Sequence, residues 1–344
     1  MFPHSPQLQS LIEKERATFH KILKKSLKLK SEPILIISDY GQLASMLGYG
    51  YYHAAQKKKL LATILYQQPK KGFMFVEDHI LNALNLLPKK SIIIIAVSNK
   101  LGRLGEEKSF RNFCKEHGHR FISATGLADL KPTQFNLILA CLNINYQSMK
   151  KRGLQIKKQW DKAKEIRVKT ELGTDITFNV ENMEAVINIG EYHQPGSGGN
   201  MPAGEVYIPP NGINNVNGTI IIDGSIKTDT GAFLLNDPLT LHIENGTLVK
   251  MTGKHAPLFE QTFEKFQERS QHPERIRLVS ELGIGINPAA LLIGSTIIDE
   301  KVLGTAHIAL GSNSWFGGAI KSIFHSDLVF KNPIFYIDGK KMEL

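Results

Sequence analysis

The chain has 344 residues, a length that favours two domains or one large domain. Hydrophobic residues make up 42% and charged residues 22%, a balance that excludes a disordered chain, a collagen and a coiled-coil rod. Lys plus Arg number 42 and Asp plus Glu number 32, and the resulting formal charge of +10 raises the question of an anionic partner.

The first predicted element is a lysine-rich amphipathic helix over residues 13–30. Phe19, Ile22, Leu23 and Leu27 recur there at helical spacing. Further lysines cluster at 57–59, 70–71 and 89–90. A solvated helix face with charged loop tips is the favoured interpretation, and a patch for nucleic acid or anionic lipid is the alternative. Because no aromatic–basic stacking pattern accompanies the lysines, we regard nucleic acid as an unlikely partner.

The bulk sequence also indicates the compartment. No stretch approaches the ~18–20 apolar residues of a membrane span. The N-terminal residues lack the apolar core of a signal peptide, so we expect a cytoplasmic protein. Cys114 and Cys141 form no CxxC pattern and are predicted to be packed core thiols.

The first half of the chain alternates short, continuous apolar runs with helical stretches. Such runs suit parallel strands covered by helices on both faces, so we predict an α/β domain with an open parallel sheet. The glycines at 48–50 and 101–105 do not form GxGxxG directly after a strand, so we reject a dinucleotide site. The predicted strands are 34–38, 63–66, 91–97, 120–123 and 137–140, and the predicted helices include 41–47 and 110–117.

A basic, helical connector over 147–164 separates two halves with different patterns. We therefore predict domains at 1–160 and 161–344, the second a mostly antiparallel β (α+β) metal-binding catalytic domain. Asn245-Gly246 and Asp338-Gly339 are hairpin signals. The predicted strands are 166–170, 175–180, 219–223, 239–244 and 247–251, with a helix over 256–268.

Carboxylates and imidazoles stand beside small residues in four segments of the second half. His325 and Asp327 are two residues apart before a β-like run, so both side chains would point to one face. His307 lies in an apolar run, and Glu281 and Glu205 also adjoin apolar strands. Singly, each has an ordinary alternative as a surface pair, a cap or a core residue. Together they form a plausible nitrogen and oxygen ligand set for one or two divalent metals.

The same segments resemble two related families. NMPAGEVYIPP (200–210), ELGIGINPAA (281–290), DEKVLGTAHIALG (299–311) and HSDLVF (325–330) occur in an order similar to that in the aminopeptidase T/aminopeptidase S metalloaminopeptidases and in the 2,5-dihydroxypyridine dioxygenases. The resemblance covers roughly residues 165–340. It implies metal ligands at Glu205, Glu281, His307, His325 and Asp327, with Glu205 also catalytic, and it implies a homodimer.

The resemblance leaves two functions open. The main prediction is a metalloaminopeptidase that uses Zn, Co or Mn to activate water for attack on a peptide substrate. The aminopeptidases typically carry a tyrosine several residues after the histidine of HIALG, whereas this chain reads HIALGSNSWFGG. The alternative is therefore a ring-cleaving dioxygenase acting on a small molecule. Its Fe(II) would be held by His307, His325 and Asp327, and Glu205 or Glu281 would serve as base or substrate holder. His272 is a further candidate for the iron, but it lies in the polar loop QHPER and is predicted to be structural.

Overall fold

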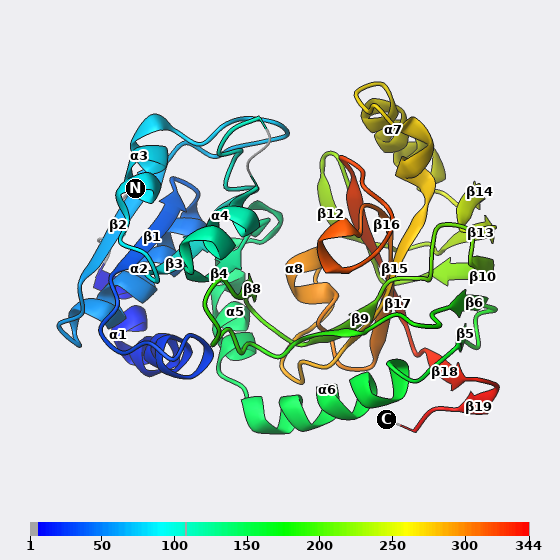
Figure 1. The fold of residues 1–344 in the computed structure, drawn as a ribbon, viewed down its shortest axis with the longest axis horizontal. Helices are drawn as coiled ribbons and strands as arrows, with labels where there is room; N and C mark the ends of the chain where they lie inside the picture. The colour runs from blue at the N-terminus through cyan, green and yellow to red at the C-terminus, as the bar shows by residue number, and fades with distance from the viewer. Residues whose placement is uncertain (1–5, 107–108, 344) are drawn as a thin grey trace. The chain divides into compact units, whose positions relative to one another are not determined.

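The protein is described by a computed structural model that covers residues 6–106 and 109–343 (Figure 1). The chain divides into two compact units. Unit 1 comprises Met1–Ile144 and Gly190–Ala203, and unit 2 comprises Asn145–Ile189 and Gly204–Leu344. The chain therefore passes into unit 2 after Ile144, returns to unit 1 for residues 190–203, and then continues in unit 2. We call residues 190–203 the returning segment.

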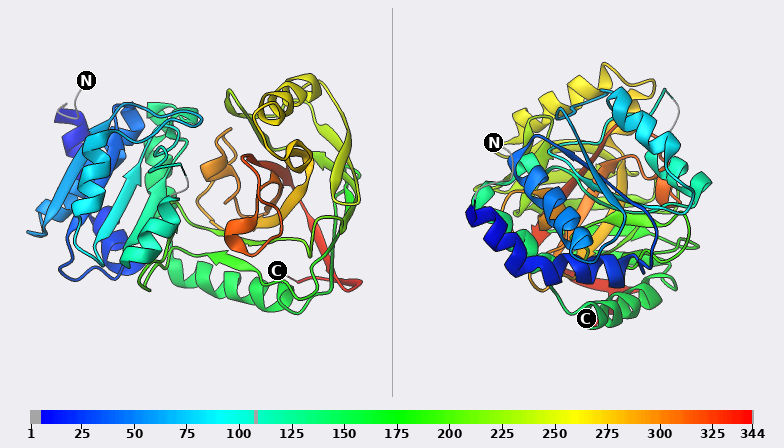
Figure 2. Two further views of the ribbon diagram at one scale, coloured as in Figure 1. Left: turned by 45° about the horizontal axis from the view of Figure 1, so that its top comes forward. Right: turned by 90° about the vertical axis from the view of Figure 1, so that its left-hand side faces the viewer.

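This division differs from the predicted boundary near residue 160. Helix α6 (Tyr146–Trp160) belongs to unit 2, where it packs along β7 and β9 (Figure 2). Its Trp160 is fully buried against Phe335, with ring centroids 5.8 Å apart. Gly153 lets the helix approach closely, since a Cβ there would lie 3.1 Å from Ile189. The basic surface of α6 made it look like a connector, although its apolar side is part of the second core.

Unit 1 is built on a five-stranded sheet in the order β2-β1-β3-β4-β8, and every pairing in it is parallel. The predicted open parallel sheet is confirmed. Its last strand, β8, comes from residues 190–203, which return to unit 1 after residues 145–189. A continuous domain that ended near residue 160 would lack this strand. The strands are β1 (Ile34–Asp39), β2 (Ala62–Gln67), β3 (Ile92–Ala96), β4 (Arg120–Ala124) and β8 (Gly198–Asn200).

Helices cover both faces of this sheet, which explains the continuous apolar runs. Leu35 and Ile93 pack in one cluster with Ile80 of α3 and Phe113 of α4. The alternate residues of the same strands are also buried, on the face towards α2. The helices of unit 1 are α1 (Pro6–Lys21), the π-helical turn η1 (Ile22–Ser26), α2 (Gln42–Gln56), α3 (Asp78–Leu86), α4 (Phe110–His117), the turns η2 (Leu127–Asp129) and η3 (Pro132–Gln134), and α5 (Phe135–Leu142).

Two predictions for unit 1 need correction. The predicted strand at 137–140 is wrong, because these residues lie within α5. The lysine-rich helix begins at Pro6, before the predicted start, and its helical part ends at Ser26. The two cysteines are free and buried as predicted, and burial raises the pKa of each thiol to about 12.

Unit 2 contains two seven-stranded sheets, and all their pairings are antiparallel. This confirms the predicted β-rich second half. One sheet has the order β14-β13-β10-β6-β5-β18-β19 and the other β12-β11-β17-β16-β15-β9-β7. Its strands are β5 (Glu165–Lys169), β6 (Asp175–Asn179), β7 (Val186–Asn188), β9 (Glu205–Ile208), β10 (Val216–Ile222), β11 (Ser225–Thr228), β12 (Gly231–Leu234), β13 (Leu239–Glu244), β14 (Thr247–Thr252), β15 (Val279–Gly285), β16 (Thr305–Gly311), β17 (His325–Lys331), β18 (Ile334–Ile337) and β19 (Lys340–Lys341).

Both predicted hairpins are present. Asn245 and Gly246 join β13 to β14 with φ of 48° and 74°, and Asp338 and Gly339 join β18 to β19 with φ of 47° and 81°. Positive φ at both central residues is the type I′ geometry that Asn-Gly and Asp-Gly favour. The remaining helices are α7 (Ala256–Gln267), η4 (Pro273–Arg277), α8 (Thr296–Asp299) and η5 (Ser314–Phe316).

We expect His119 to make the stability of unit 1 depend on pH. Its ring is fully buried and lies parallel to His117 at 5.6 Å. Burial, helped by the charge of His117, lowers the pKa of His119 to about 4. The unfolded chain takes up this proton near pH 6.5, whereas the folded chain takes it up only near pH 4. Stability should therefore fall as pH decreases from about 6.5 to 4, by about 1.4 kcal/mol for each unit of difference in pKa.

Hydrogen exchange of β3 and β4 amides between pH 7 and 4, corrected for intrinsic rates, measures this effect. His119→Leu should flatten the pH dependence, because the apolar side chain cannot titrate. His79→Gln, at an exposed histidine of the same unit, should leave it unchanged. An equally steep loss of protection in His119→Leu would contradict the assignment.

Candidate metal centre

Three neighbouring strands of unit 2 bring the predicted site residues to one face of a sheet. Ala309 of β16 pairs with Glu281 of β15 on one side and with Asp327 of β17 on the other. His307 lies two residues from Ala309 along β16, and His325 lies two residues from Asp327 along β17. Since side chains alternate along a strand, all four functional groups share the face of Ala309. The small alanine leaves room between the two carboxylates.

Four of the predicted residues form a compact cluster there. Ligand atoms of Glu281, His325 and Asp327 all lie within 4.8 Å of one another. His325 Nε2 is 3.3 Å from Asp327 Oδ1 and 3.9 Å from Glu281 Oε2. His307 Nε2 is 3.2 Å from Glu281 Oε1, and its side chain is fully buried. We call these four residues the carboxylate–imidazole cluster.

The hydrogen bonds orient the two imidazoles. His325 Nδ1 is 2.9 Å from the carbonyl oxygen of Ser312, which can only accept, so Nδ1 carries the hydrogen. This leaves Nε2 facing the carboxylates, the arrangement by which metal-binding histidines are usually held. Among the described residues, the buried Nδ1 of His307 has no hydrogen-bond partner. An orphaned polar atom in this position is costly, which suggests a functional constraint on the ring.

The electrostatics of the cluster reflect tight pairing. Burial acts to lower the pKa of both histidines. The hydrogen bond to Glu281 outweighs burial at His307 and raises its pKa to about 9. The charge of Asp327 does the same at His325, where the pKa is also raised to about 9. Burial acts to raise the pKa of Asp327, but His325 holds it well below its usual range. Burial raises the pKa of Glu281. A metal ion binding to these groups would therefore have to displace protons.

Glu205, the fifth predicted residue, does not join this group. It lies on β9 opposite Gly285, and its Oε1 is 2.6 Å from Lys301 Nζ and accepts a hydrogen bond from Asn188 Nδ2 at 3.2 Å. Lys301 is completely buried and also pairs with Glu300. The sequence analysis missed Lys301 and Glu300. The signal was a charged Asp-Glu-Lys triplet between Ile-Ile and Val-Leu, where charges need partners to be buried.

Aromatic rings adjoin the cluster in the segment SNSWFGG, where this chain lacks the tyrosine that the aminopeptidases typically carry. The Trp315 ring lies 4.8 Å from the ring of His325 and 5.2 Å from that of Phe316. Phe316 in turn packs edge-on against Tyr207 of β9 at 5.0 Å. Trp315 is 47% exposed, so it can contact a ligand. His272 is exposed beside Glu274, 3.4 Å away, and is absent from the cluster.

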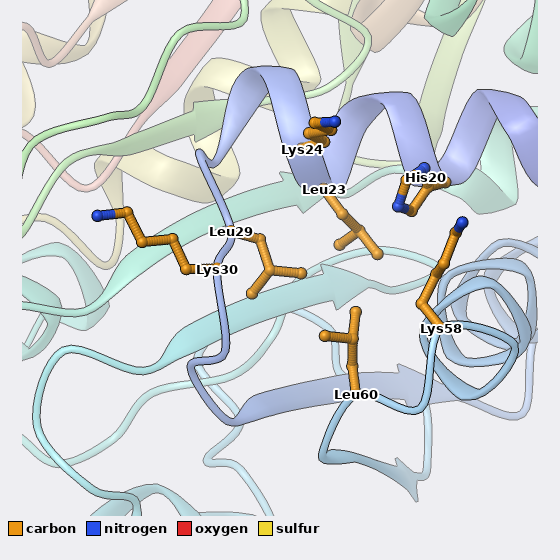
Figure 3. Close-up of a pocket in the computed structure, with 7 residues that line it drawn as sticks. All are labelled: His20, Leu23, Lys24, Leu29, Lys30, Lys58 and Leu60. Carbon is orange, nitrogen blue, oxygen red and sulfur yellow. The ribbon is translucent and has the colours of Figure 1, made fainter.

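The lysine-rich N-terminal segment borders a pocket of about 340 Å³ in unit 1 (Figure 3). The side chains of Leu23, Leu29 and Leu60 point toward one another there, whereas those of Lys24 and Lys30 extend away from them. The pocket includes none of the predicted site residues. Its lining consists of His20, Leu23, Lys24, Leu29, Lys30, Lys58 and Leu60.

Comparison with known proteins identifies the family to which the chain belongs. The family model of 2,5-dihydroxypyridine 5,6-dioxygenase matches residues 139–343, more than half of the chain. The chain therefore belongs to the 2,5-dihydroxypyridine 5,6-dioxygenase family. The curated enzyme of that name from Pseudomonas putida is 24% identical over 205 residues. That match spans 57% of the length of each protein.

Two solved structures share the fold over nearly the whole chain. The 2,5-dihydroxypyridine dioxygenase of Pseudomonas putida aligns with a TM-score of 0.75 at 17% identity, over 97% of this chain and 96% of that one. AmpT of Thermus thermophilus, an aminopeptidase T, aligns with a TM-score of 0.69 at 12% identity, over 96% and 97%. The predicted resemblance to both families is confirmed, to the aminopeptidases at the level of fold. The sequence matches name the dioxygenase, which was the alternative prediction.

The family match supports an enzyme, and the ligand atoms of Glu281, His325 and Asp327 are close enough together to hold a metal ion. None of the described helices has the length and apolarity needed to cross a membrane.

Proposed function

We propose that the protein is a non-haem Fe(II) dioxygenase that cleaves the ring of a hydroxylated nitrogen heteroaromatic compound such as 2,5-dihydroxypyridine. The observation that carries this proposal is the convergence of Glu281, His325 and Asp327 within 4.8 Å in a member of the dioxygenase family.

The donor set fits a single metal ion. Ligand atoms that bind one octahedral metal at about 2.1 Å lie about 3 Å from their neighbours. The contacts from His307 to Glu281 and from His325 to Asp327, at 3.2 and 3.3 Å, are close to that separation. Two imidazoles and two carboxylates suit Fe(II), which would supply dioxygen chemistry at its remaining open positions. In this proposal the four cluster residues hold the metal.

The surrounding residues support an aromatic substrate. Trp315 packs edge-on against His325, and Phe316 packs edge-on against Trp315. Rings of this kind favour offset or edge-on contact with a flat substrate. The carbonyl of Ser312 fixes the His325 ring, which in turn sets the position of its Nε2.

A two-metal aminopeptidase is the second candidate, and the whole-chain likeness to AmpT favours it. That mechanism needs Glu205 as a metal ligand, whereas this carboxylate is bound to Lys301. The contact supports the dioxygenase over the aminopeptidase. Self-association into a homodimer stays a prediction from the resemblance.

Oxygen consumption tests the proposal directly. Protein loaded anaerobically with Fe(II) should consume dioxygen in a 1:1 ratio with 2,5-dihydroxypyridine as the ring absorbance disappears. Protein loaded with redox-inactive Zn²⁺ should not. If the iron protein consumes no oxygen with a panel of dihydroxypyridines, while Zn-, Co- or Mn-loaded protein releases leucine from leucyl amide, the aminopeptidase replaces the dioxygenase.

A further inference from the structure

Lys301 is an ammonium ion buried at the edge of the candidate metal centre. Its side chain has no exposed surface, and its Nζ lies 2.6 Å from Glu205 and in direct contact with Glu300. The backbone is fixed as well, since the Lys301 carbonyl accepts a hydrogen bond from Asn287 N at 2.8 Å and its N–H donates to Ile298 at 3.0 Å. The ammonium group is therefore held in one position.

A buried ammonium is stable only when carboxylates around it replace water. The contacts continue into the cluster, because the Glu300 side chain lies within hydrogen-bonding reach of Asp327. The order of charges is thus Glu205, Lys301, Glu300, Asp327. The positive charge lies among carboxylates, next to the proposed metal ligands.

Two-metal sites place a second cation about 3.5–4 Å from the first, bound by carboxylates such as these. Starting from the proposed metal site, we propose that Lys301 Nζ takes the place of a second metal ion. The protein then holds one metal per chain. Glu205 and Glu300 are the carboxylates that a second divalent ion would bind if the ammonium were removed.

Metal stoichiometry tests this role. Wild-type protein and Lys301→Ala are each saturated with Mn²⁺, desalted and analysed for metal per chain, and Mn²⁺ paramagnetic resonance distinguishes an isolated ion from a coupled pair. Wild type should bind one isolated ion and Lys301→Ala two coupled ions. Lys331→Ala is the control. It removes a lysine of β17 that pairs with Asp223 at 3.3 Å, and the variant should still bind one ion.

Lys301→Ala leaves two buried carboxylates without a cation and could fail to fold. The double variant Lys301→Met with Glu205→Gln removes both charges of the closest pair. It should fold and bind one ion.

The outcomes separate this inference from the proposed function. Two ions in the wild type, or one ion in a folded Lys301→Ala, would overturn the role of Lys301. If Lys301→Ala does not fold alone, it should fold when Mn²⁺ is present, because a second ion then replaces the missing charge between Glu205 and Glu300. A variant that stays unfolded with Mn²⁺ would also overturn the role of Lys301. One ion per chain without oxygen consumption would overturn the dioxygenase and leave the role of Lys301 standing. An absence of metal from every variant would contradict the proposed metal centre itself.

Discussion

His325→Ala should lose its metal ion under conditions in which the wild type retains one. Nε2 of His325 lies between Asp327 and Glu281, so its removal takes away the donor that contacts both carboxylates. Loss of an outer-shell partner typically costs 10–100-fold in metal affinity, and loss of a direct ligand should exceed about 100-fold. Elemental analysis after desalting, with titration by Mn²⁺, measures the change.

The fold should survive this substitution, because the His325 side chain is partly exposed and comes from a strand with pairing on both sides. Hydrogen exchange of the unit 1 strands should match that of the wild type. His242→Ala, at a histidine on β13 of the other sheet, is the control and should retain the metal. Stoichiometric metal in His325→Ala would refute the ligand assignment.

Gly283→Ala should weaken metal binding at least 10–100-fold without removing any ligand. Gly283 pairs directly with His307 across β15 and β16, and a Cβ at this position would lie 2.0 Å from His307 Nε2 and 2.2 Å from its Cε1. The ring is completely buried and has to tilt, which breaks its contact with Glu281. We expect about 1–3 kcal/mol of destabilisation from overpacking and at least a 10–100-fold loss of metal affinity.

Isothermal titration with Mn²⁺ and thermal unfolding measure these two effects separately. Gly153→Ala is the matched control, because its Cβ meets side-chain atoms of Ile189 and Ile286 at 3.1 and 3.2 Å, within unit 2 but away from the cluster. It should change stability and leave metal affinity intact. Wild-type affinity in Gly283→Ala would mean that the His307 ring has no part in binding.

Local patterns predicted much of this fold and four members of the cluster. Continuous apolar runs indicated β1, β3 and β4 because both faces of that sheet are covered. The same logic failed at 137–140, since α5 is apolar on most of its surface and a short apolar run does not distinguish a buried helix from a strand. His325 and Asp327 were found through their i, i+2 spacing, which is a local property.

The other features depend on contacts between distant parts of the chain. β8 contains only Gly198, Gly199 and Asn200, which have little strand preference, and it exists because it pairs with β4. From the sequence alone, Lys301 would be taken for an exposed lysine beside Glu300, whereas in the structure it is buried. Its burial depends on Glu205, nearly a hundred positions earlier in the chain. The sequence alone revealed that the aminopeptidase tyrosine is absent after HIALG. The contacts of Trp315 and Tyr207 with Phe316 could be seen only in the structure.

The returning segment 190–203 has a consequence for how the protein is made. The ribosome completes the edge strand β8 roughly 3–11 s after residue 144, at ordinary translation rates of about 5–20 residues per second. During that interval β4 lies at an unpaired sheet edge, the kind of edge that recruits other chains. Unit 1 therefore cannot complete its sheet as an N-terminal fragment. A truncation at residue 144 should be prone to aggregation, whereas a fragment that continues through Ala203 would supply the missing strand.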